Sequence, residues 1–169
     1  MNEAFMRERP VLPLIVTMSL PMVLSMLVNS LYNIVDSYFV GQYSNSGLTA
    51  LSVIFPVQLI ITAIAVGTGV GVNTYMARMY AFGKKRAADC TAGTGMVLAV
   101  ISWAVFAVAM LLLMEPYVRT SATSPDAVAD AVLYGNIVCV GSLGIFLESI
   151  WTKVHQAGGN MRLPMLAQI

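Results

Sequence analysis

The residues of this sequence best suited to chemistry are an aspartate and two asparagines inside its first long apolar stretch. Asn29, Asn33 and Asp36 are separated by four and three residues, a spacing that places them on one face of a helix. A carboxylate that faces lipid costs several kcal/mol, so an acid inside a membrane span normally faces a cavity or a partner. We therefore predict that Asp36 exchanges protons or sodium ions and that Asn33 and Asn29 line the same cavity.

Each of these polar residues also has a structural interpretation. Asp36 lies five residues before Gly41, where the end of a long helix would let it contact headgroup water. Asn29 and Asn33 would serve equally as hydrogen-bonding groups between helices. Pro21 lies 15 residues before Asp36 and removes a backbone hydrogen bond, so we expect it to bend the helix, with a static kink as the alternative.

The elements that must position these side chains are membrane spans. Of the 169 residues, 58% are apolar and 10% are charged, against roughly 45–50% and 25% in an average soluble domain. The charges also cluster and leave long apolar stretches that exceed the ~20 residues needed to cross a bilayer. We predict an all-α polytopic membrane protein that forms a single membrane domain over residues 1–169. Its four complete transmembrane helices lie at about 13–40, 48–78, 91–114 and 125–155, and a fifth helix starts at 163–169.

Several local signals set the expected ends of these helices. Gly41 is suited to a left-handed position that ends the first helix. Glu115 stands before Pro116, and the residue before a proline is pushed away from helical geometry, so the third helix should end there. The Ser-Pro-Asp sequence at 124–126 supplies a capping hydroxyl, a proline for the first turn and an acid for the positive end of the fourth helix. The Gly-Gly-Asn sequence at 158–160 should end it.

Glycines in the second span resemble a dinucleotide-binding fingerprint only superficially. In that fingerprint the third glycine follows the second by three residues, whereas Gly71 follows Gly69 by two. No strand is expected before Gly67 either. Gly67 and Gly71 form a small-xxx-small pair, which favours close packing against another helix. Pro56 in the same span predicts a kink.

The remaining polar and sulfur-containing side chains have structural interpretations. Glu148 is a second acid within a span, and we expect it to form an ion pair with Lys153 or Arg78. The single histidine, His155, is expected at the inner interface. The two cysteines at 90 and 139 are expected to be packing residues, because a zinc site needs more ligands at short spacing.

Whole classes of function are excluded by what the sequence lacks. It contains no Ser/His/Asp arrangement, phosphate-binding loop or metal-ligand cluster, so we expect neither an enzyme nor a cofactor beyond a coupling ion. The net charge is +1 and no basic block is longer than Lys84-Lys85-Arg86, which gives no electrostatic footprint for nucleic acid.

The distribution of lysine and arginine predicts the orientation in the membrane. With the N-terminus in the cytoplasm, eight of the nine basic residues fall on the inner side and only Arg119 falls outside. Because positively charged loops remain cytoplasmic, this orientation is favoured. The inner residues are Arg7, Arg9, Arg78, Lys84, Lys85, Arg86, Lys153 and Arg162.

Three segments together resemble the multidrug and toxic compound extrusion (MATE) family. The sequence LYNIVDSYFVG at 31–41 resembles the end of that family's first helix, where an asparagine precedes an aspartate. The sequence GTGVGVN at 67–73, followed by Ala77-Arg78 and Gly83-Lys84-Lys85, resembles its second helix and basic turn. QAGGN at 156–160 resembles the approach to its fifth helix, although Asn160 replaces the acid that often follows the glycine.

The resemblance implies more than the residues alone. Members of the family have twelve helices in two six-helix bundles, so the chain looks like a truncated N-terminal lobe. Asp36 matches the family's coupling aspartate of the first helix, while the asparagine and acid of the fifth helix would fall after Ile169. The implied function is a proton- or sodium-coupled antiporter of the bacterial plasma membrane that exports amphipathic, often cationic, organic compounds or drugs. Its implied partners are the lipid bilayer and the helices of the missing C-terminal lobe.

Two other functions compete with export. A flippase for lipid-linked sugars would usually have a more cationic cavity, whereas these spans carry acids and no central arginine. A non-transporting membrane fragment, or a subunit that depends on a partner for the missing helices, is the second alternative.

Overall fold

The computed structural model describes residues 10–43, 45–122 and 124–168, and within these ranges the regular structure is helical with no strand. The helices are α2 (Val11–Tyr43), α3 (Asn45–Ala81), α4 (Lys85–Ser121), α5 (Pro125–Gly141), α6 (Leu143–Ala157) and α7 (Arg162–Gln168). In the described residues, four helical segments are long and apolar enough to cross a membrane: Val11–Gln42, Gly47–Ala81, Lys85–Ser121 and Pro125–Ala157. The predicted all-α membrane fold is confirmed.

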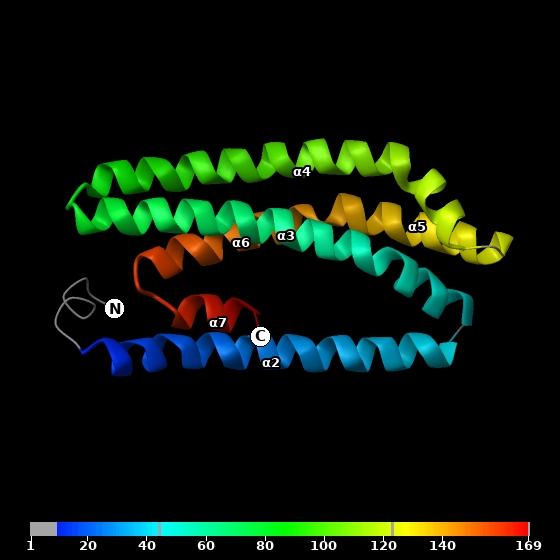
Figure 1. The fold of residues 1–169 in the computed structure, drawn as a ribbon, viewed down its shortest axis with the longest axis horizontal. Helices are drawn as coiled ribbons and strands as arrows, with labels where there is room; N and C mark the ends of the chain where they lie inside the picture. Colours follow the sequence, from blue (N-terminus) through cyan, green and yellow to red (C-terminus); the bar gives the residue numbers. More distant parts are fainter. Residues whose placement is uncertain (1–9, 44, 123, 169) are drawn as a thin grey trace.

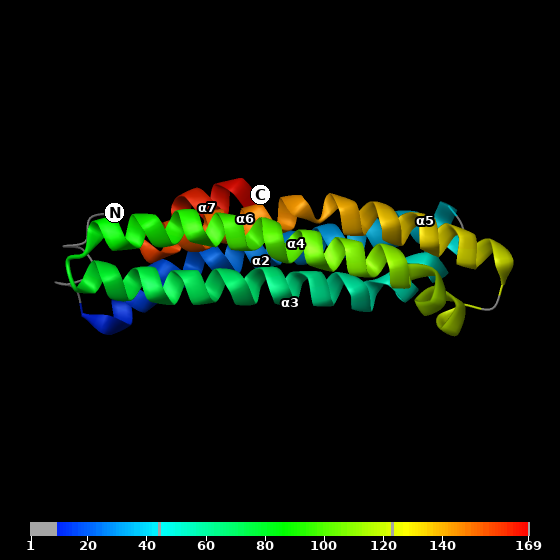
Figure 2. The same cartoon turned by 90° about the horizontal axis from the view of Figure 1, so that it is seen from above.

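Helix α3 is the centre of the arrangement. It forms an antiparallel hairpin with α4 and also packs along α5 and α6. Figures 1 and 2 show these helices as one elongated bundle, with α2 running beside it on the side away from α4. Helix α2 contacts α3 and the short helix α7, which itself contacts α6. The bundle therefore consists of a packed group, α3 to α6, and a more peripheral helix, α2.

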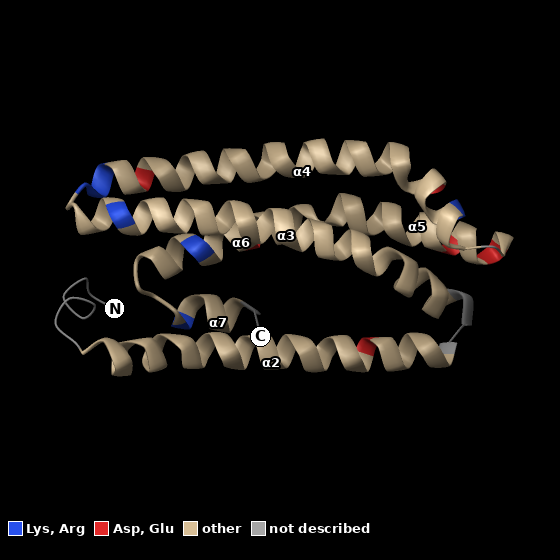
Figure 3. Cartoon of the chain, viewed as in Figure 1, with Lys and Arg blue, Asp and Glu red and all other residues tan. Residues whose placement is uncertain are grey.

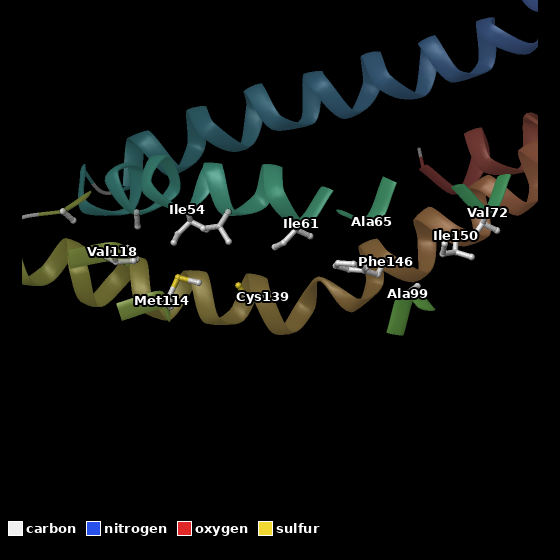
Figure 4. Close-up of a cluster of buried hydrophobic side chains, with 14 of the residues drawn as sticks. Ile54, Ile61, Ala65, Val72, Ala99, Met114, Val118, Cys139, Phe146 and Ile150 are labelled. Carbon is white, nitrogen blue, oxygen red and sulfur yellow. The ribbon is translucent and has the colours of Figure 1, made fainter. Parts of the chain in front are cut away.

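The core of the packed group comes from one face of α3. Ile54, Ile61 and Ala65 are almost fully buried, and their spacing of seven and four residues returns them to the same side of the helix. Figure 4 shows them facing Met114, Cys139 and Phe146 from the neighbouring helices. Because lipid is as apolar as these side chains, close van der Waals packing rather than exclusion of water holds such helices together.

Glycine permits the closest approach between helices of the packed group. A Cβ atom at Gly135 of α5 would lie 2.6 Å from Met114 Sδ and 2.9 Å from Ile54 Cδ1. A Cβ at Gly69 would lie 2.8 Å from Lys153 Cγ. The predicted packing role of Gly67 and Gly71 is wrong for the described chain, since a Cβ at either would meet nothing within 4 Å. The small-xxx-small spacing does not show which face of a helix its neighbour occupies.

Two predicted helix ends are corrected by the structure. Gly41 lies inside α2, and Pro116 lies inside α4, which continues to Ser121. A proline removes only one backbone hydrogen bond, so a helix can bend and continue beyond it. Figure 1 shows α4 bending close to its end. Glu115 also stabilises the final turns, because its Oε1 accepts from Arg119 Nη2 at 2.7 Å across one turn.

The fourth span begins as expected but is divided in two. Ser124 caps it, with its Oγ accepting from the backbone N of Ala127 at 3.4 Å, and Pro125 occupies the first turn. The predicted fourth span is present as Pro125–Ala157, with Ser142 alone between α5 and α6. The Ser142 hydroxyl donates to the carbonyl of Cys139 at 2.7 Å, and such a bond competes with the backbone pattern of a helix.

Helices α3 and α6 end with the same backbone arrangement. Gly83 after α3 and Gly159 after α6 have φ angles of +70° and +77°, which only glycine adopts without strain. The backbone N of Lys84 donates to the carbonyl of Met79, and that of Asn160 to the carbonyl of His155. These bonds span five residues and close a Schellman motif. The expected end near 158–160 is confirmed.

Candidate functional site

The polar face predicted on the first span is present on α2. Asn33 Nδ2 donates to the backbone O of Asn29 at 2.9 Å and to its Oδ1 at 3.0 Å. Ser37 Oγ donates to the carbonyl of Asn33 at 2.8 Å. Asp36 lies in the next turn of the same helix, three residues after Asn33. The structure therefore links the two asparagines directly and places the acid beside them on the helix.

This face is not enclosed by the described part of the chain. Asn29, Asn33 and Asp36 are all exposed, so the expectation that Asp36 lies inside the bundle is not met among these residues. Only 6% of the most apolar stretch of α2 is buried. Figure 3 shows the acid of α2 well away from the acids at the ends of α4 and α5. Within the described residues, no three His, Cys, Asp or Glu side chains come together as a metal site.

Pro21 lies inside α2, as expected from its position. In the view of Figure 1, α2 shows no bend along its length. The bending role predicted for Pro21 is therefore not displayed in this conformation. Pro56 likewise lies inside α3.

Sequence reasoning missed a polar pair between α3 and α5. Gln58 Nε2 donates to Tyr134 OH at 3.1 Å, and both side chains are half-buried. Tyr117 OH of α4 also donates to the carbonyl of Val53 at 2.9 Å. The only sequence signal for these bonds was the presence of polar side chains within charge-free spans.

A second group of polar contacts joins α3 to α6. Asn73 Nδ2 donates to the carbonyl of Lys153 at 2.7 Å, and Ser149 Oγ donates to the carbonyl of Ala65 at 3.0 Å. These are bonds between helices, of the kind that side chains make in membrane proteins. They fix the register of α6 on α3.

The charged and aromatic groups near this interface have local partners. Glu148 Oε1 accepts from the Thr152 hydroxyl at 2.6 Å, and Lys153 Nζ donates to Gln156 Oε1 at 3.0 Å. Arg78, the other partner predicted for Glu148, lies over the ring of Phe82 at 5.7 Å. Lys153 thus has a neutral partner where an ion pair was predicted.

The surroundings of the single histidine and of the two cysteines are as follows. His155 Nδ1 lies 2.9 Å from the carbonyl of Trp151, and the two rings are 4.2 Å apart. Cys139 is buried, as a packing residue should be, whereas Cys90 is exposed. The packing role predicted for Cys90 is therefore wrong, because it faces away from the neighbouring helices.

Comparison with known proteins places this arrangement in a family. The MatE family model matches residues 21–169. An FAD transporter of Shewanella oneidensis is 28% identical over 160 residues, which are 93% of this chain and 35% of that protein.

Two solved structures have the same fold over most of this chain. A MOP superfamily transporter from Pyrococcus furiosus, described as having a binding pocket of reverse polarity, is 29% identical with a TM-score of 0.87. An outward-facing multidrug resistance MATE family transporter has the same identity and TM-score. The match covers 92% of this chain and 34% of each of these structures. The chain thus spans about a third of the length of the relatives it matches.

Proposed function

The chain belongs to the MatE family, whose members matched here are transporters and not enzymes, and from this premise we propose that it is part of a cation-coupled antiporter. The proposed substrates are amphipathic, often cationic, organic compounds, and the proposed mechanism is alternating access between two lobes. Its apolar helices make it a multi-pass membrane protein.

The observation that carries this proposal is the acid of α2 beside two amides. Asp36 is the only charged residue within the described part of the span Val11–Gln42. A carboxylate inside a membrane span is costly unless it is neutralised by a proton or a bound cation. The amides of Asn33 and Asn29, linked at 3.0 Å, supply polar neighbours for either ion. Pro21, 15 residues earlier on the same helix, is the proposed point of bending.

The proposed location is the plasma membrane of a bacterium, with the N-terminus and the α3–α4 turn in the cytoplasm. The described basic residues gather at the end of the bundle that holds this turn, as Figure 3 shows. Arg119, in the last turn of α4, lies at the opposite end. This distribution supports the orientation, because positively charged segments resist translocation.

Cysteine labelling tests the orientation. A cysteine introduced at Ser121 should react with a membrane-impermeant reagent added outside intact cells, whereas one at Lys84 should react only after the membrane is opened. The reverse pattern would contradict the proposed orientation. Both variants are made with Cys90 and Cys139 replaced by serine, so that only the new thiol is read.

A second candidate substrate is a flavin dinucleotide. The matched protein of Shewanella oneidensis is named an FAD transporter and aligns with 93% of this chain. FAD carries two phosphates, so its export would call for cationic groups along the route. The basic residues of the described spans lie toward the ends, as Figure 3 shows, which favours organic cations and also disfavours the flippase alternative. A fragment without transport activity of its own is the remaining alternative.

The gene product is expressed from its own locus, and its transport activity is measured in inverted membrane vesicles. This measurement separates these possibilities. We expect uptake of a fluorescent organic cation under an imposed proton or sodium gradient. Asp36→Asn should reduce it at least about tenfold, because the amide keeps the shape of the side chain but neither takes up nor releases a proton. Asp89→Asn, which neutralises an exposed acid near the start of α4, is the matched control.

The outcomes are distinct. Near-normal uptake by Asp36→Asn would remove the coupling role and favour an aspartate that only contacts headgroup water. Gradient-dependent uptake of FAD in place of the cation would select the flavin substrate. Absence of uptake of either compound by the wild-type product would favour the non-transporting alternative.

A further inference from the structure

We draw no further inference here: the strongest candidate, the cavity of about 410 Å³ between the start of α3 and the end of α4, is lined mostly by exposed residues, and in a chain that spans about a third of the length of its relatives nothing in the structure shows what covers it.

Discussion

Helix α2 and the α3–α6 group are both apolar enough to span a membrane, yet they are packed very differently. In the most apolar stretch of α2 only 6% of the residues are buried, against 11% in that of α4 and 28% in those of α3 and of the α5–α6 segment. The side-chain hydrogen bonds of Asn33 and Ser37 in α2 stay within that helix, whereas Asn73 and Ser149 join α3 to α6. The packed group stabilises the fold, and the exposed helix carries the candidate coupling residue.

The difference shows that apolar composition alone does not determine packing in a membrane protein. Helices associate where small residues let them approach and where polar groups find partners across the contact. The α3–α6 group has both, at Gly135 and at Asn73. Helix α2 instead leaves Asn29, Asn33 and Asp36 exposed, and the side-chain bond between the two asparagines stays within that helix.

The largest expected effect is at the closest helix contact. Gly135→Leu should lower the free energy of unfolding by about 2–3 kcal/mol or prevent folding, because its Cβ alone would lie 2.6 Å from Met114 Sδ. Thermal unfolding in detergent, followed by circular dichroism, measures the change. Gly67→Leu is the matched control on α3, where a Cβ meets nothing within 4 Å. Equal losses in the two variants would contradict the packing account.

A smaller effect is expected at the polar contacts between helices. Asn73→Ala removes a 2.7 Å hydrogen bond to the carbonyl of Lys153 and should cost about 1 kcal/mol in chemical unfolding. Asn33→Ala removes bonds that stay within α2 and are exposed, so it should cost less than about 0.5 kcal/mol. An equal or larger cost for Asn33 would mean that α2 is packed as firmly as the α3–α6 group.

Two tyrosines repeat this comparison for a single hydroxyl. Tyr117→Phe removes the 2.9 Å hydrogen bond from α4 to Val53 of α3 and should lower the free energy of unfolding by about 0.6 kcal/mol. Tyr38→Phe removes an exposed hydroxyl that accepts from Gln42 within α2 and should have no measurable effect. Urea unfolding of both variants in the same detergent gives the difference, and a loss in Tyr38→Phe alone would reverse the assignment of the two regions.

The smallest effect on stability is expected at the residue with the largest proposed effect on transport. Asp36→Asn should change the free energy of unfolding by less than about 0.5 kcal/mol, because the side chain is exposed in α2. The same variant is expected to lose at least about nine-tenths of the coupled uptake. Parallel unfolding and uptake measurements check this separation. A destabilisation as large as that of Asn73→Ala would indicate that Asp36 supports the fold.

Several features of this protein were determined by the sequence alone. The number and approximate place of the spans follow from composition, because a bilayer requires long stretches without charge. The pairing of Asn29 with Asn33 follows from their separation of four residues, which brings side chains together on any helix. The start of α5 at Ser124-Pro125 follows from capping, since the hydroxyl satisfies a backbone N–H that the helix cannot. All three depend on contacts within a few residues of chain or on total apolarity.

The tertiary structure decided what depends on residues distant in sequence. Gly69 rather than Gly67 or Gly71 packs closely, because α6 lies against that side of α3. Pro116 lies inside α4 and does not end it, and Tyr117 in the continuing turn reaches the carbonyl of Val53 on another helix. Asp36 stays exposed because the described helices gather around α3 and leave the polar face of α2 uncovered. Spacing along one helix assigns residues to a face, but only the placement of neighbouring helices decides whether that face is buried.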